Sequence, residues 1–121
     1  MVGLFDPLMG GLERVLDLRM QQHTLTSSNL ANSDTPGFRA HELDLSVDLP
    51  EAIQSGGRSG PMSEPVVHEL EPPPWSVDGN SVLPEREMSR LSANAVLYSA
   101  VTRGLGRRLA ILRYAASDGR G

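Results

Sequence analysis

The chain has 121 residues, which is room for at most one domain. Aromatic residues make up only 4% of it, which argues against a large aromatic-lined pocket, and the net charge of −4 weakly disfavours nucleic acid as the main partner. The absence of cysteine excludes disulfides, thiolate metal sites and cysteine nucleophiles. The N-terminal segment has neither the basic region nor the long apolar run of a cleaved signal peptide, and no apolar stretch is long enough to span a bilayer.

Residues 6–34 are predicted to form the first helix, which starts at about Pro7 and ends near Ala31. Asp6 is a suitable N-cap, and proline suits the first helical position. Apolar residues at helical spacing form a stripe along this helix, and Leu18 lies off that stripe. The stripe consists of Leu8, Leu12, Val15, Leu16 and Met20.

Residues 35–49 are predicted to form a turn and then a short strand. Pro36 and Gly37 suit the central positions of a type II turn, where glycine supplies the positive φ. Apolar and polar residues then alternate, and this period of two is typical of a half-buried strand. The apolar members are Leu43, Leu45, Val47 and Leu49.

Residues 50–77 are rich in proline and glycine, and this composition predicts a disordered spacer without regular elements. Six of the nine prolines fall between Pro50 and Pro74. A turn is expected around Asp78, Gly79 and Asn80, with a short strand beside it. Residues 117–121 are expected to be a disordered tail.

Residues 78–116 are predicted to contain that turn and then a long helix from about Pro84 to Ala116. Its apolar and small residues keep a coiled-coil spacing over more than three heptads. The packing seam predicted for the two helices consists of Leu12, Leu16, Met20, Ala95, Leu105, Leu109 and Leu112. Further apolar residues lie elsewhere on the second helix, so we expect it to have neighbours on more than one side.

The length of the second helix indicates whether the chain can fold as an isolated compact domain. The second helix would be about 50 Å long, whereas a compact domain of this size is roughly 35 Å across. The leftover apolar surface must then be buried against other chains, which predicts an assembly subunit.

Charge is distributed unevenly along the chain. Residues 40–87 hold ten carboxylates, whereas residues 100–121 hold five arginines and only one acidic residue. We hypothesise that the arginines from Arg103 to Arg113 meet acidic surfaces of neighbouring subunits or line a channel. Gly104 and Gly106 weaken the same helix, and close helix approach and a mobile segment are equally good explanations.

Two sequence blocks resemble a known family. The first follows the pattern Asn-x-Ala-Asn-x-x-Thr-Pro-Gly-aromatic through Asn29, Ala31, Asn32, Thr35, Pro36, Gly37 and Phe38. The second consists of Asp78, Gly79, Asn80, Val82, Glu87, Met88, Leu91, Asn94 and Tyr98. Together the blocks resemble bacterial flagellar basal-body rod proteins, and the second is most similar to proximal rod subunits of the B type (FlgB-like). The C-type proximal rod subunit remains an alternative, as does a generic coiled-coil adaptor.

The resemblance implies a mainly α fold, in which the N- and C-terminal helices pair into a coiled-coil-like inner domain of D0 type. It implies export through the flagellar type III apparatus without a cleaved signal peptide, and helical assembly in the periplasmic rod of the basal body. The implied partners are copies of the chain, other rod subunits, the ring-to-rod adaptor, the inner-membrane ring and the export gate. No nucleic acid or small-molecule substrate is implied.

Catalytic, cofactor and metal sites are not expected. His23, His41 and His68 lack metal-ligand spacing, and no nucleophile elbow accompanies the serines. We hypothesise instead that Asn29 and Asn32 satisfy backbone groups where the first helix gives way to the strand. The second helix lacks the acidic residue that usually precedes it, so Ser81 is a candidate for its N-terminal cap.

Overall fold

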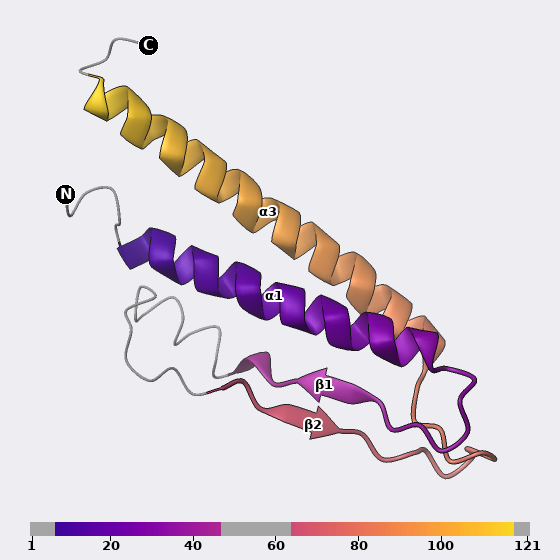
Figure 1. Cartoon of the computed structure of the whole chain (residues 1–121). Coiled ribbons are helices and arrows are strands. Elements are labelled where there is room, and N and C mark those ends of the chain that lie inside the picture. The colour runs from indigo at the N-terminus through magenta and orange to yellow at the C-terminus, as the bar shows by residue number, and fades with distance from the viewer. Residues whose placement is uncertain (1–6, 47–63, 118–121) are drawn as a thin grey trace.

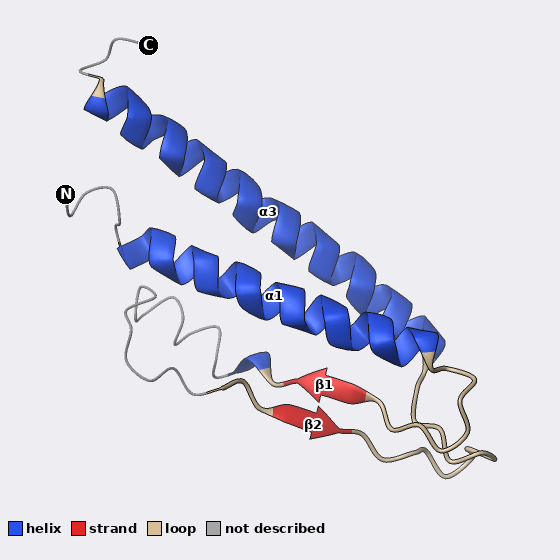
Figure 2. Ribbon diagram, viewed as in Figure 1, coloured by secondary structure: helices blue, strands red, loops and turns tan. Residues whose placement is uncertain are grey.

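The computed structural model describes residues 7–46 and 64–117, and its architecture is mainly α (Figure 1). Helix α1 (Pro7–Ala31) and helix α3 (Pro84–Ala116) run antiparallel to one another. Strand β1 (His41–Leu43) and strand β2 (Val67–Glu69) form an antiparallel two-stranded ribbon beside α1 (Figure 2). The predicted fold class, two terminal helices with a short β segment between them, is confirmed.

Both helices have the predicted bounds because their ends are encoded locally. Proline stands at the first position of each, where its missing N–H leaves no bond unmade. The expected N-cap of α1, Asp6, lies outside the described residues. The expected cap of α3 is wrong: Leu83 takes the N-cap position without a side-chain bond. The Ser81 hydroxyl instead accepts a hydrogen bond from the Ala40 backbone N–H at 2.7 Å.

A small core lies where α1, β1 and α3 meet. Val15, Leu18 and Leu43 form it, and Val101 of α3 packs against it. Leu18, which lies off the predicted stripe, is completely buried, whereas Met20 of the stripe is 49% exposed. The helix packs against both a strand and a helix, so the buried line follows Val15, Leu18 and Gln22 and not the row from Leu12 to Met20.

Strand β1 lies earlier in the chain than the strand predicted over residues 43–49. Strand β1 ends at Leu43, and Leu45 and Ser46 already belong to a helical turn. Asp44 causes the change of direction, because its Oδ1 accepts the Ser46 N–H at 3.0 Å in an Asx turn. Val47 and Leu49 lie outside the described residues.

Within the described residues of the segment 50–77, a strand forms where the composition predicted no regular element. Strand β2 forms there because β1 offers its backbone, with His41 opposite Glu69 and Leu43 opposite Val67. The neighbouring Asp44 N–H donates to the Val66 carbonyl at 2.9 Å. Pairing thus overrides the low local propensity at Val67–Glu69, while residues 47–63 and the tail 118–121 lie outside the described part of the chain.

Apolar side chains remain exposed along α3. Met88, Val96, Ile111 and Tyr114 are each 59–68% exposed. The 33 residues of the helix extend over about 50 Å, and the other described elements cover only one side of it (Figure 1). No helix in the described ranges combines the length and apolar character needed to cross a membrane.

The two glycines of α3 do not serve close packing within the chain. A Cβ added at Gly104 or Gly106 would meet no atom within 4 Å. Of the two explanations offered by the sequence, close helix approach therefore requires a neighbouring chain.

The core position of Leu18 predicts a large effect of its truncation. Leu18→Ala removes a fully buried side chain and should lower the free energy of unfolding by about 2–4 kcal/mol. Met20→Ala, on the same helix but half-exposed, should change it by less than about 0.5 kcal/mol. Urea titration followed by circular dichroism, in the presence of a stabilising osmolyte, measures both. Equal losses at the two positions would contradict the placement of the core.

The Asx turn predicts an unusually acidic carboxyl group. Hydrogen bonds from the Ser46 hydroxyl and backbone, and then from His68, lower the pKa of Asp44 from its ordinary value of 3.8 to about 2. A depressed pKa means that the stabilisation by this carboxylate is complete above its unfolded pKa and is lost as the pH falls through about 2. Carbon NMR titration should find that midpoint, and Ser46→Ala should raise it more than His68→Ala does.

Candidate functional site, the junction of the two sequence blocks

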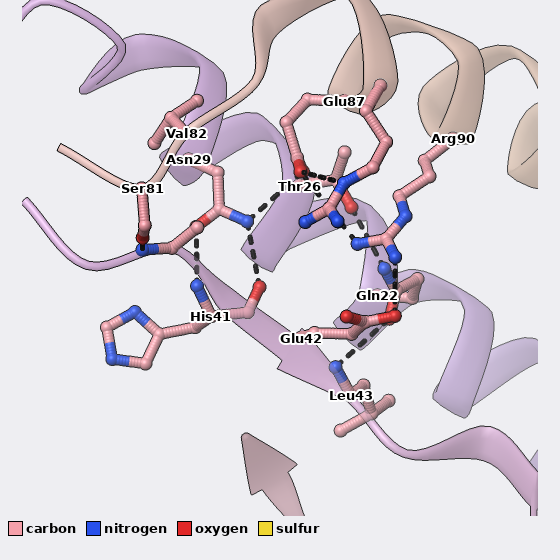
Figure 3. A network of polar contacts seen from close by, with 12 residues as sticks. Gln22, Thr26, Asn29, His41, Glu42, Leu43, Ser81, Val82, Glu87 and Arg90 are labelled. Atoms are coloured by element: carbon pink, nitrogen blue, oxygen red, sulfur yellow. Dashed lines mark hydrogen bonds and ion pairs between the residues drawn. The ribbon is translucent and has the colours of Figure 1, made fainter. Parts of the chain in front are cut away.

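The end of α1 and the start of α3 meet in a polar junction (Figure 3), and Asn29 lies at its centre. The Asn29 amide donates from Nδ2 to the His41 carbonyl at 2.8 Å, and its Oδ1 accepts the His41 N–H at 2.9 Å. One side chain therefore satisfies both backbone groups of the first residue of β1. Nδ2 also donates to Glu87 Oε2 of α3 at 3.1 Å. Asn29 thus joins three elements, and its predicted role at the helix-to-strand transition is confirmed.

Asn32 acts more locally at the end of α1. Its Nδ2 donates to the Ser28 carbonyl at 2.8 Å, and its Oδ1 accepts the Thr35 hydroxyl at 3.1 Å. These contacts satisfy a carbonyl in the last helical turn, as predicted, but they do not reach the strand or α3.

Asn80, in the second sequence block, hydrogen-bonds to the turn that follows α1. Its buried Nδ2 lies 2.8–3.0 Å from the backbone carbonyl oxygens of Asn32, Ser33 and Thr35. All three residues follow the end of α1 at Ala31, so this one amide holds together the turn that leads out of the helix. Asn80 Oδ1 accepts the Val82 N–H at 2.7 Å, so the same side chain also orients the segment that leads into α3.

Two turns that contain glycine lie against one another beside Asn80. Gly37 and Gly79 have φ values of 73° and 74°, a region that side chains with a Cβ rarely adopt. The Phe38 N–H donates to the Thr35 carbonyl at 3.2 Å and closes the predicted turn. The Gly37 N–H donates to the Asp78 carbonyl at 2.8 Å, so the two turns are hydrogen-bonded to one another.

Glu87 is a fully buried carboxylate on the first turn of α3. Its Oε2 accepts from Asn29, while its Oε1 lies 3.7 Å from Arg86 Nε and 3.8 Å from Arg90 Nη1. Arg90 Nη2 in turn contacts Glu42 Oε1 at 2.6 Å (Figure 3). Removing a carboxylate from water is costly unless partners compensate. The Asn29 hydrogen bond to Oε2 and the positive charges of the two guanidinium groups provide that compensation, and Oε1 itself accepts no hydrogen bond within the described residues.

Asn94 makes a second polar link, about two turns further along α3. Its Nδ2 donates to the Arg19 carbonyl of α1 at 2.8 Å, and its Oδ1 accepts from Arg19 Nη1 at 3.5 Å. Partial burial lowers the pKa of Arg19. A polar residue at a buried position of a helix pair sets the register, and Asn94 occupies such a position.

Other predicted site residues take no part in this polar network. Ala31 and Pro36 are exposed, and Met88 is 59% exposed. Leu91 and Tyr98 are half-buried on α3. For the predicted seam, Ala95 and Leu109 are exposed, and Leu12, Leu16, Leu105 and Leu112 are half-buried. Their role in assembly stays a prediction.

Sequence reasoning missed two buried polar residues of α1. Gln22 Oε1 accepts the Leu43 N–H at 3.3 Å, and Gln22 Nε2 donates to Thr26 Oγ1 at 3.0 Å. The signal was present, because Val15, Leu18, Gln22, Thr26 and Asn29 follow one another at spacings of three and four. Only the polar nature of the last three hid this line.

The junction is a structural joint. Its amides donate to backbone carbonyls and to the Glu87 carboxylate, and the described residues contain no cluster of three or more metal-ligating side chains. A helix pair fastened at one end, with exposed apolar residues along the longer helix, defines a structural subunit of an assembly.

Comparison with known proteins identifies the assembly. No family model matches the chain. The chain is 32% identical to the flagellar basal body rod protein FlgB of Yersinia enterocolitica, over 88% of this chain and 93% of that protein. It is 30% identical to FlgB of Yersinia ruckeri and 28% identical to FlgB of Salmonella typhimurium, with 93% and 92% of those proteins covered. The chain belongs to the FlgB family of flagellar basal body rod proteins, and it is a structural component of the basal-body rod.

The contact between Asn29 and Glu87 predicts a charge-dependent double-mutant cycle. Asn29→Asp places a carboxylate against a buried carboxylate and also removes the donor to His41, so it should destabilise by about 3 kcal/mol or more. Adding Glu87→Gln removes the repulsion and restores a donor across the interface. Urea titration of the two single variants and the double variant should show recovery of at least about 1 kcal/mol. Strictly additive losses would mean that the two side chains do not interact.

Proposed function

We propose that the chain is a proximal rod subunit that assembles helically, with α1 and α3 packed against the terminal helices of neighbouring subunits. The observation that carries this proposal is the exposed apolar surface along α3, which no other described element covers. Burial of such surface drives most protein association. In this arrangement the subunit encloses the export channel, transmits torque and catalyses no reaction.

The joint at one end of the helix pair is consistent with a role in transmitting torque. Torque passing along a rod must cross from one terminal helix to the other within each subunit. The contacts of Asn29, Asn80 and Glu87 connect the last turn of α1 to the first turn of α3. Directional hydrogen bonds between buried groups resist displacement. The junction therefore gives the two helices a fixed mutual geometry at that end.

The small core supports export of the chain in an unfolded state. The buried apolar side chains among the described residues are Met9, Val15, Leu18, Ala40, Leu43 and Val82. So small a core leaves an isolated chain only marginally stable. A subunit with low stability unfolds readily for passage through the flagellar type III apparatus, and it gains stability from its neighbours after arrival.

The partners follow from this placement. Copies of the chain and other rod subunits would cover the helices, and the ring-to-rod adaptor, the inner-membrane ring and the export gate would lie at the proximal end. The site of action would be the periplasmic rod, reached without a cleaved signal peptide. The similarity to proteins named FlgB, over most of their length, favours the B type over the C type of proximal rod subunit.

Complementation tests the proposal. In a bacterium that lacks its own FlgB, expression of this chain should restore rods in isolated basal bodies and swimming in soft agar. Asn80→Ala should reduce both strongly, because it removes the buried amide that donates to three carbonyls of the turn after α1, at a cost of about 1–3 kcal/mol. Val77→Ala serves as the control, since this side chain in the same loop is fully exposed.

The outcome that counts against the proposal is equally concrete. Chain that accumulates in the cell but is absent from purified basal bodies would contradict a rod function. Normal rods with Asn80→Ala would contradict the role of the junction alone.

A further inference from the structure

The side of α3 that points away from the core has an unusual composition. Val96, Ala100, Arg103, Arg107 and Tyr114 follow one another at spacings of four, three, four and seven residues, which places them on one face of the helix. All five are exposed, Val96 by 68% and Tyr114 by 60%. We call this set the α3 outer face.

This face is not composed like a solvated surface. From Met88 to Ser117 the chain contains no aspartate or glutamate, although it carries five arginines. Solvated helix faces mix both signs of charge, whereas arginine and tyrosine are enriched where proteins meet. The α3 outer face therefore has the chemistry of an interface for an acidic partner.

A complementary face lies on α1 of the same chain. Glu13, Asp17, Met20 and Thr24 follow one another at spacings of four, three and four residues, and all are exposed. We call this set the α1 outer face. Its two carboxylates are spaced as Arg103 and Arg107 are on α3, one helical turn apart. Within the described part of the chain, no ion pair involves any of the four charged side chains of the two faces, Glu13, Asp17, Arg103 and Arg107.

The two faces lie at neighbouring heights along the helix pair. Asn94 of α3 contacts Arg19 of α1, and Glu87 contacts Asn29. Since α1 and α3 run antiparallel (Figure 1), these contacts place Arg103 level with residues 10–13 of α1. A second copy set alongside with an axial shift of about one to two helical turns therefore brings its Asp17 level with Arg103 and its Glu13 level with Arg107.

We propose that the α3 outer face of one copy binds the α1 outer face of the next, through Arg103–Asp17 and Arg107–Glu13 ion pairs flanked by Met20 against Ala100. This inference rests on the proposed assembly function and names the surfaces that carry it. The contact joins two different faces, so every bound copy still presents one free face of each kind. Such heterologous contacts form rings or helical assemblies and do not stop at a dimer.

Crosslinking tests the contact in the complete chain, because a chain without cysteine allows introduced cysteines to be read without background. Met20→Cys and Ala100→Cys are placed in separate copies that are coexpressed in a bacterium lacking its own FlgB, and basal bodies are oxidised. Disulfide-linked dimers should form between the two variants. They should not form within either variant alone, nor between Ala100→Cys and Val77→Cys, whose exposed position lies in the loop before α3.

Charge reversal then tests the ion pairs. Adding Arg103→Glu and Arg107→Glu to the Ala100→Cys copy should lower the dimer yield about tenfold, because like charges then oppose one another. Adding Glu13→Arg and Asp17→Arg to the Met20→Cys copy should restore it. Unchanged yield after the first reversal, or no recovery after the second, overturns the proposal. Raised salt should lower the yield of the unreversed pair.

Two further outcomes distinguish this proposal from an anion-binding role of the α3 outer face and from failure of the proposed rod function. If the first reversal leaves crosslinking unchanged but abolishes cosedimentation with DNA or with vesicles of anionic lipid, the α3 outer face is an anion-binding surface and the proposal is wrong. If the unreversed chain never enters basal bodies, the rod function fails. The same crosslinking in concentrated purified chain then decides the contact by itself.

Discussion

The fold depends on a single buried amide. Asn29 binds both backbone groups of His41 and the buried carboxylate of Glu87, so it holds the strand and the second helix against the end of the first. The contact between Arg90 and Glu42 joins the same helix and strand. Asn80 holds the same end from the outside, because its amide donates to carbonyls of the turn that follows α1. The polar residues of the two sequence blocks thus belong together, because each block completes the hydrogen bonding of the other.

How far the fold follows from the sequence depends on whether its causes are local. The bounds of both helices and the turn at Gly37 were predictable, since proline at a first helical position and a Pro-Gly pair act through neighbouring residues alone. The position of β1 and the presence of β2 were not, because each strand forms only against the other. A short strand without a strong local preference takes its structure from its partner.

The candidate site was predictable only in part, for a related reason. Asn29 was identified as a residue that satisfies backbone groups, but its contact with Glu87 joins residues 58 positions apart. Ser81 was taken for a helix cap, and its hydroxyl binds Ala40 instead, 41 positions away. Leu18 lies off the predicted stripe and is nevertheless buried, because the first helix packs against both a strand and a second helix. Polar residues at buried positions are the ones whose partners a single sequence does not reveal.

The line of buried residues on α1 changes character along its length, from Val15 and Leu18 to Gln22, Thr26 and Asn29. Apolar contacts are non-directional, whereas hydrogen bonds demand a defined geometry. Hydrogen bonds consequently hold the two helices in a defined relative geometry at the junction, whereas apolar contacts hold them toward the opposite end. Such a molecule can keep one shape at the junction while the other ends of its helices adjust to neighbours that are not all equivalent.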